Sequence, residues 1–142
     1  MIKLQNQDLK NVADFLQNTI SVKGKKNIHR MRIVKALLQR NKDVGEEEIA
    51  LLEEFAKLDD NGELKRNDAG GFDIEDTKGF SEQHKALYDE YFVIEDKNLE
   101  SALKTVEKLV NDYDKELSGK QAEAHFILVE AFEENNTEEG AE

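Results

Sequence analysis

The three histidines are the first residues to consider for chemistry, because imidazole ligates metals and transfers protons near neutral pH. None of His29, His84 and His125 stands at metal-ligand spacing from another, and the chain has no cysteine. The sequence also lacks a Gly-x-Ser-x-Gly elbow, a phosphate loop and a dinucleotide-binding fingerprint. We therefore predict no catalytic residues, no metal site and no cofactor, and a protein that is not an enzyme.

A second candidate for chemistry is the acidic turn at Asp59-Asp60-Asn61-Gly62, which has the composition of a calcium-binding loop. If Gly62 were the obligatory glycine of such a loop, Lys57 would occupy the first ligand position and Asp68 the last. A cation at the first position and a short final side chain leave too few oxygen ligands. The segment is better interpreted as a turn.

The strongest signal in the chain is an uneven distribution of charge. The first 42 residues carry ten Lys/Arg and two acidic residues, a formal charge of +8, whereas the remaining hundred carry ten Lys/Arg and thirty acidic residues, a charge of −20. Such a separation indicates that the basic end has a binding partner. The partner can be the acidic part of the same chain, a second copy of it, or a foreign macromolecule.

The basic residues fall on a helix that the periodicity predicts over residues 25–42. A further helix is predicted from Val44 to about Leu58, where three glutamates in the first turn suit the helix dipole. We predict that contacts with a partner are made by one face of the basic helix and the start of the acidic one: Lys25, His29, Arg32, Arg40, Glu46 and Glu47. Arg30 falls towards the apolar side and is expected in an ion pair with a carboxylate.

Three interpretations of these charges stay open. The basic face can contact phosphates, but the net charge of −12 and the absence of interleaved aromatic residues argue against nucleic acid as the main partner. The cations can also pair with acidic residues of the same chain. Conversely, an acidic surface can mimic a nucleic acid backbone and block a nuclease, or simply confer solubility. The candidate residues for mimicry are Glu46, Glu47, Glu53, Glu54, Asp59 and Asp60.

The remaining patterns predict a mainly α fold. A short strand is expected at residues 2–4, helices at about 7–19, 81–91, 97–116 and 119–134, and a small hairpin near 60–75. Asp96 is expected to cap the helix that follows it. A heptad seam runs from Leu99 to Leu117 and suits an antiparallel pair with the last helix, or a contact between two copies. With no internal repeat detected, the prediction is a single domain of five or six helices over 1–134, with an acidic disordered tail at 135–142.

Several stretches together resemble a family of small uncharacterised proteins, a domain of unknown function, encoded by tailed phages of Gram-positive bacteria. They are Ile2 to Leu9, the Arg30-x-Arg32-x-x-Lys35 helix, Glu53 to Gly62, Phe72-Asp73-Ile74, and Leu117 to Glu123 continuing through Glu130 to Glu133. The resemblance implies a phage product made in the host bacterial cytoplasm. Because the family has no assigned function, it transfers no site residues.

Taken together, these observations predict a phage accessory protein that acts by protein–protein interaction, as an assembly factor or as a factor that binds a host protein. The alternatives are an acidic mimic that inhibits a host defence nuclease, and nucleic acid binding through the basic helix. A homo-oligomer is compatible with the heptad seam. No apolar run approaches the roughly 20 residues that a membrane-spanning helix needs, so we expect no membrane association.

Overall fold

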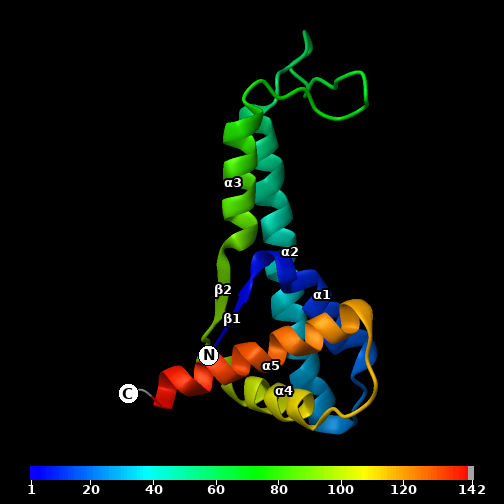
Figure 1. Cartoon of the computed structure of the whole chain (residues 1–142), viewed down its shortest axis with the longest axis vertical. Helices are drawn as coiled ribbons and strands as arrows, with labels where there is room; N and C mark the ends of the chain where they lie inside the picture. Colours follow the sequence, from blue (N-terminus) through cyan, green and yellow to red (C-terminus); the bar gives the residue numbers. More distant parts are fainter. Residues whose placement is uncertain (141–142) are drawn as a thin grey trace. The chain divides into compact units, whose positions relative to one another are not determined.

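The computed structural model describes residues 1–140, and it confirms a mainly α-helical chain with a small antiparallel sheet. The order of the main elements is β1 (Ile2–Gln5), α1 (Leu9–Asp14), α2 (Gly24–Phe55), α3 (Thr77–Asp89), β2 (Tyr91–Ile94), α4 (Glu100–Asp112) and α5 (Gly119–Gly140) (Figure 1). Short 3₁₀ turns precede α1 and α4, and a π-helical turn at Phe15–Thr19 follows α1. No helix in this part of the chain is long and apolar enough to cross a membrane.

The chain divides into two compact units, both within the predicted domain 1–134 except for the end of the last helix. Unit 1 consists of Met1–Asn41 together with the chain from Tyr91 onward, and unit 2 consists of Lys42–Glu90. Helix α2 is continuous from Gly24 to Phe55 and contributes to both units.

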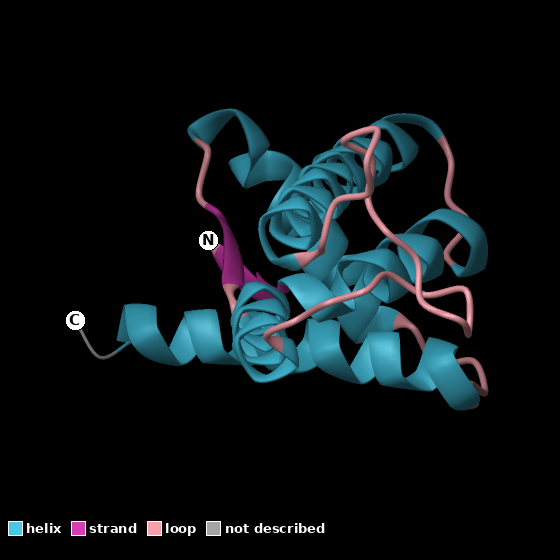
Figure 2. Cartoon of the chain, turned by 90° about the horizontal axis from the view of Figure 1, so that it is seen from above, coloured by secondary structure: helices cyan, strands magenta, loops and turns pink. Residues whose placement is uncertain are grey.

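The sheet belongs to unit 1 and joins the start of the chain to a strand almost ninety residues later. Ile2 pairs with Ile94 and Leu4 with Phe92 in an antiparallel ladder (Figure 2). Ile2 and Leu4 are buried and Lys3 is exposed, so the strand has the period-two alternation that the sequence predicted. Helix α5 packs against β1.

Buried apolar side chains form the core of unit 1. They come from α1, the π-helical turn, α2, α4 and α5, and the largest include Phe15, Leu37, Val106 and Leu128. The predicted pairing of the heptad helix with the last helix is confirmed, since α4 contacts α5 and buries Val106 and Val110. The side chain of Phe126 is 66% exposed, because the face that α5 buries contains Ala124, Leu128, Ala131 and Phe132.

The expected ion pair of Arg30 is also wrong, because its guanidinium bonds to backbone carbonyls. Its Nη1 donates to the carbonyl oxygens of Leu16 at 2.8 Å, Gln17 at 3.0 Å and Ile20 at 2.5 Å. The last carbonyls of a helix have no intrahelical donor and carry partial negative charge. Arg30 therefore closes the end of the π-helical turn, a role that a carboxylate partner would prevent.

Unit 2 contains the second part of α2, the connection 56–76 and helix α3. The predicted break between two helices, after Lys42 and before Val44, is wrong, because α2 is continuous there and passes through Gly45. A glycine inside a helix costs about 1 kcal/mol relative to alanine. Val44 is buried, and tertiary packing of this kind overrides a local preference of that size.

The connection in unit 2 is an eight-residue repeat that the sequence analysis missed. Its three copies are residues 56–63, 64–71 and 72–79. Isolated β-bridges join Leu58 to Leu64, Arg66 to Phe72 and Ile74 to Ala56. The third residue of each copy therefore pairs with the first residue of the next, and the third copy pairs back with the first. The expected simple hairpin at 60–75 is replaced by this three-part ring.

The second residue of each copy lies in a closed triangle of backbone hydrogen bonds. The N–H of Lys65 donates to the carbonyl of Lys57, that of Asp73 to Lys65, and that of Lys57 to Asp73, each at 2.8 Å. The approximate three-fold symmetry of the connection therefore includes these backbone hydrogen bonds, in which the N–H and the carbonyl of each of the three residues find a partner.

The fourth residue of the first two copies builds the turn. The Oδ1 of Asp59 accepts the N–H groups of Asn61 and Glu63, and the Oδ1 of Asn67 accepts those of Ala69 and Gly71. Gly62 and Gly70 occupy the seventh position with φ of 81° and 88°, which other residues rarely adopt. The third copy departs from this pattern because Asp76 caps α3 through the N–H of Gly79 at 2.9 Å.

The end of the chain also differs from the prediction. Helix α5 extends to Gly140, so residues 135–140 are helical where a disordered acidic tail was expected. The hydroxyl of Thr137 donates to the carbonyl of Glu133 at 3.0 Å, one turn earlier. This bond satisfies the Thr137 hydroxyl within the helix, in a segment that the sequence predicted to be disordered. The last part of the predicted tail, 141–142, lies outside the described residues.

Candidate functional site

The six predicted partner-binding residues all lie on α2, so the structure places both signs of charge on one helix. Four of them are exposed: Lys25, Arg32, Glu46 and Glu47. Arg40 is half-buried and makes polar interactions of its own. The continuity of α2 is what makes this arrangement possible, because the acidic residues were expected to open a separate helix.

His29 is not available to a partner. It is buried in unit 1, and its Nδ1 lies 2.6 Å from the Oγ1 of Thr105 on α4. The Thr105 hydroxyl donates to the carbonyl of Ser101 at 3.2 Å, so its oxygen is left to accept the proton on His29 Nδ1. His29 therefore links α2 to α4 inside the core, and its place on the predicted basic face is wrong.

Unit 2 contains a polar cluster that sequence reasoning did not find. The Oε2 of Glu48 on α2 lies 3.1 Å from His84 Nε2 and accepts a hydrogen bond from the hydroxyl of Tyr88, both on α3. The hydrogen bond to Glu48, then burial and the charge of the same carboxylate, raise the pKa of Tyr88 to about 12. One carboxylate oxygen thus contacts both His84 and Tyr88, which joins α2 to α3.

Aromatic rings extend this cluster along α3. The ring centroids of Phe80 and His84 lie 5.4 Å apart and those of His84 and Tyr88 lie 4.9 Å apart, while Phe55 of α2 meets Phe80 at 6.0 Å. Phe80, His84 and Tyr88 recur at every fourth residue of the sequence, a spacing that places three rings on one face of a helix. This spacing could have predicted the cluster.

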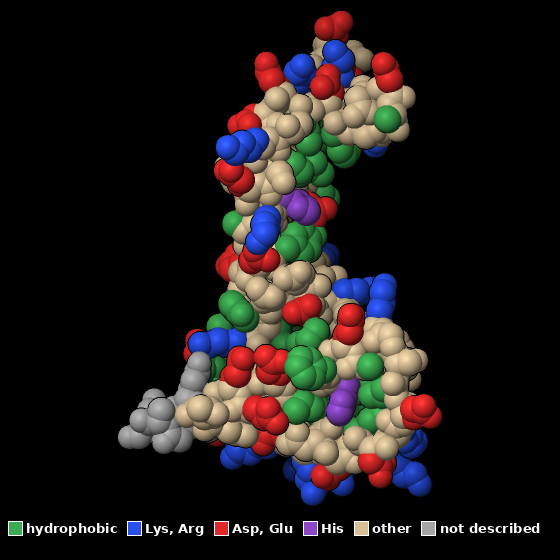
Figure 3. All heavy atoms as spheres, viewed as in Figure 1, with side chains coloured by type: hydrophobic (Ala, Val, Ile, Leu, Met, Phe, Trp, Pro, Cys, Tyr) green, Lys and Arg blue, Asp and Glu red, His purple; other side chains and the backbone are tan. Residues whose placement is uncertain are grey.

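An open groove lies beside this cluster, also within unit 2. Leu51 of α2 and Ala86 and Leu87 of α3 form its apolar lining, and Glu47, Gln83 and Glu90 form its polar edge. Its volume is about 320 Å³. Figure 3 shows hydrophobic side chains that reach the surface between charged ones along the two helices of unit 2. The groove can hold apolar side chains and favours cations around them.

Acidic residues are concentrated in the same unit. The 49 residues of unit 2 contain sixteen Asp/Glu and six Lys/Arg, a formal charge of −10, whereas the rest of the chain carries sixteen against fourteen, a charge of −2. All six residues considered for nucleic acid mimicry lie in unit 2 and are exposed. The acidic half of the predicted charge separation is therefore densest in unit 2, and two of its carboxylates, Glu47 and Glu90, line the groove.

A second, smaller pocket lies in unit 1 and has a volume of about 140 Å³. Asp8, Glu130 and Glu134 contribute carboxylates to its lining, together with Lys3 and Tyr91. Burial, and then the charge of Glu123, raise the pKa of Asp8 above its ordinary value. In the described residues, no three His, Asp or Glu side chains come together in a way that could hold a metal ion.

Comparison with known proteins does not identify the chain: no family model, no curated protein and no solved structure matches it. The resemblance to a phage family stays a prediction.

Proposed function

We propose that this protein is a non-enzymatic binding protein that recruits another protein through the acidic groove of unit 2. The observation that carries the proposal is the combination of an apolar lining, Leu51, Ala86 and Leu87, with a surrounding unit of formal charge −10. Apolar contact supplies affinity and the surrounding charge supplies selectivity and faster association. The partner class that fits is an amphipathic segment with Lys or Arg beside its apolar residues.

The biological setting of the proposal follows from the sequence resemblance. We infer a phage-encoded accessory protein that acts in the bacterial host cytoplasm, either in particle assembly or on a host protein. In this proposal unit 1, with its apolar core, is the folded support, and unit 2 is the binding element.

The test is affinity purification with mass spectrometry from infected or expressing bacterial cells. We expect a protein that the wild type captures and that the double variant Glu47→Lys/Glu90→Lys loses. The matched control is Glu63→Lys/Glu82→Lys, which makes the same charge change at exposed positions of unit 2 outside the groove. A partner retained equally by all three proteins, or no partner at all, contradicts the proposal.

A second function is favoured by the exposure of Glu46, Glu47, Glu53, Glu54, Asp59 and Asp60. An acidic mimic of nucleic acid would occupy the cationic groove of a host defence nuclease and would compete with its substrate. Competition between this protein and a DNA duplex for such an enzyme supports mimicry. Capture of a partner that does not bind nucleic acid favours the first proposal.

A further inference from the structure

The two helices of unit 2 form an antiparallel pair whose apolar packing is incomplete. Glu48 of α2 contacts Tyr88 near the end of α3, whereas Phe55 contacts Phe80 near its start, so the two helices run in opposite directions. None of the thirteen residues of α3, all of them described, is buried. A helix of this length normally gains its stability by packing an apolar face against other elements. Helix α3 therefore leaves part of its apolar face uncovered.

This uncovered apolar surface lies in the groove between the two helices. Leu51 of α2 forms one wall, Ala86 and Leu87 of α3 form the other, and every lining residue belongs to unit 2. On α3 the lining extends from Gln83 to Glu90. Seven residue steps of a helix cover about 10 Å, or two turns. The groove therefore has the length to contact two turns of another helix.

The walls of the groove offer side chains to an occupant and no free backbone groups. Both walls are α-helices, in which the backbone N–H and carbonyl groups bond to one another within the helix. An extended segment in the groove would leave its own buried backbone groups without partners, which costs free energy. In the described part of the chain, strand pairing occurs in the β1–β2 sheet and in the bridges of the repeat, away from this lining. A helical occupant satisfies its backbone internally and presents only side chains.

The charge of unit 2 selects the sign of the occupant. Because Glu48 contacts Tyr88, the carboxylates of Glu47 and Glu90 lie at the same end of the groove. Glu47 has an interaction of its own within the chain, so the argument rests on the exposed Glu90 and on the formal charge of −10 that unit 2 carries. The same groove of a second copy would bring a unit of equal negative charge, and like charges oppose that contact. A cationic segment of a different protein is complementary.

We propose that the occupant of the groove is a single amphipathic α-helix of another protein, which lies beside α2 and α3 as the third helix of a bundle. Its apolar residues, spaced at i, i+3 or i+4 and i+7, cover Leu51, Ala86 and Leu87. Its Lys or Arg residues lie at the end of the groove where Glu90 is exposed. Because a bound helix covers the apolar face of α3, binding also stabilises unit 2.

This inference rests on the proposed function of the groove, and it adds the secondary structure of the partner and the end at which its cations lie. The test measures the binding of two synthetic peptides of about fourteen residues, a length at which an isolated helix is marginal. The first peptide has leucines at i, i+4, i+7 and i+11 in an alanine background, with Lys and Arg grouped at one end. The second is identical except that two central alanines are replaced by proline, which breaks a helix interior.

Calorimetric titration of the full-length protein with each peptide gives the affinities. We expect the first peptide to bind at least about tenfold more tightly than the second, because only the first can form the helix. Circular dichroism of the first mixture should show more helix than the sum of its components. Hydrogen exchange at the amides of α3 should become slower when this peptide is bound, because the helix gains a partner for its apolar face.

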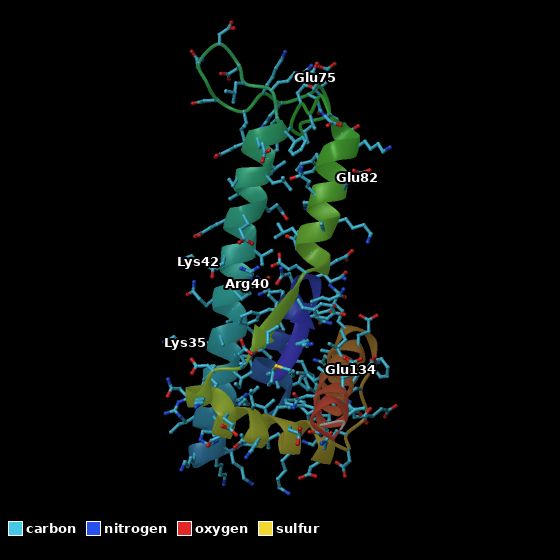
Figure 4. The ribbon with its side chains drawn as sticks, turned by 90° about the vertical axis from the view of Figure 1, so that its left-hand side faces the viewer. Lys35, Arg40, Lys42, Glu75, Glu82 and Glu134 are labelled. Carbon is cyan, nitrogen blue, oxygen red and sulfur yellow. The ribbon has the colours of Figure 1, made fainter. Side chains whose placement is uncertain are left out.

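Two pairs of variants place the peptide in the groove. Ala86→Arg puts a long cationic side chain into the groove from an exposed position and should weaken binding at least about tenfold. Its matched control, Ser81→Arg, makes the same change at an exposed position of α3 outside the lining and should bind as the wild type does. Glu90→Lys should weaken binding about two- to fivefold. Glu75→Lys should leave it unchanged, because Glu75 lies beside the start of α3, at the opposite end of this helix from Glu90 (Figure 4).

The outcomes separate this inference from the groove function on which it rests. Equal binding of the two peptides, no binding of either, or binding without a gain in helix content overturns the helical partner. If a protein is still captured from cells and lost in Glu47→Lys/Glu90→Lys, the groove function survives that result. Absence of any captured protein removes the groove function itself. Self-association of the wild type that Ala86→Arg abolishes overturns the inference and assigns the groove to a second copy of this chain.

Discussion

Of the twenty-two buried hydrophobic side chains among the described residues, all but Val44 and Ala56 lie in unit 1. Unit 2 is held mainly by polar and aromatic contacts: the Glu48, His84 and Tyr88 cluster, the ring contacts of α3 and the hydrogen bonds of the eight-residue repeat. The comparison teaches that one chain can combine a unit stabilised by apolar burial with a unit specified by hydrogen bonds. A unit with few buried apolar contacts opens at a lower free energy.

The largest expected effect contrasts a buried leucine of unit 1 with an exposed leucine of unit 2. Leu128→Ala should lower the free energy of unfolding by about 2–5 kcal/mol, because it leaves a cavity in the core. Leu58→Ala, at a side chain that is 59% exposed, should change it by less than about 0.5 kcal/mol. Chemical denaturation measures both, and equal losses would remove the distinction between the units.

The next effect tests whether unit 1 depends on a polar contact as well. Arg30→Met should cost about 2–3 kcal/mol, because it leaves the carbonyls of Leu16, Gln17 and Ile20 without their shared donor. Arg32→Met, at an exposed position two residues later, is the matched control and should be neutral to within about 0.5 kcal/mol. Retained stability in Arg30→Met would show that the π-helical turn closes without the guanidinium.

A smaller effect concerns the turns of the repeat in unit 2. Asp59→Ala and Asn67→Ala should each cost about 1 kcal/mol locally, because each removes two side-chain hydrogen bonds to the backbone. Hydrogen exchange should become faster at the amides of 56–74 while the amides of unit 1 are unchanged. The exposed neighbours Asp60 and Asp68 supply the controls, and alanine there should leave exchange in the repeat as it was.

The smallest effect concerns pH and the Tyr88 hydroxyl. Its pKa in the folded chain is about 12 against an ordinary value of 10, so folding favours the protonated phenol. The resulting stabilisation should be complete below pH 10 and be lost as the pH rises to about 12. Tyr88→Phe should remove that pH dependence and cost under about 1 kcal/mol at neutral pH, since the site is partly solvated. Unfolding curves of both proteins across this range provide the measurement, and parallel curves would contradict the assignment.

The sequence predicted the elements whose signals are local and strong. The alternation at Ile2 and Leu4, the cap at Asp96, whose side chain accepts the N–H of Asn98, and the first part of the Leu99–Leu117 seam all act within a few residues. The predicted helix 97–116 is too long, because α4 ends at Asp112 and Leu117 lies beyond it. The pairing of β1 with β2 joins positions almost ninety residues apart, and no single-chain pattern specifies that contact.

The wrong predictions at the candidate site also come from contacts between residues that are far apart in the sequence. One helix was predicted to end at Lys42 and the next to open at Val44, but tertiary burial of Val44 outweighs the cost of Gly45, so Lys25, Arg32 and Glu46 belong to the same helix. His29 shares the basic helix with exposed cations, and only the packing of α4 against α2 reveals that it is buried. The repeat was missed because its first two copies share few residue types beyond Gly62 and Gly70, and because α3 begins at Thr77 inside the third copy.

The triangle formed by Lys57, Lys65 and Asp73 sets a rule for how this connection can change length. Each copy contributes one N–H donor and one carbonyl acceptor to this triangle, so removing or adding one copy of eight residues separates at least one donor from its present acceptor. Insertions within the turns at Gly62 or Gly70 lengthen only the turn and leave the three hydrogen bonds intact. In related chains, length variation should therefore occur at these two turns, while the number of copies stays at three.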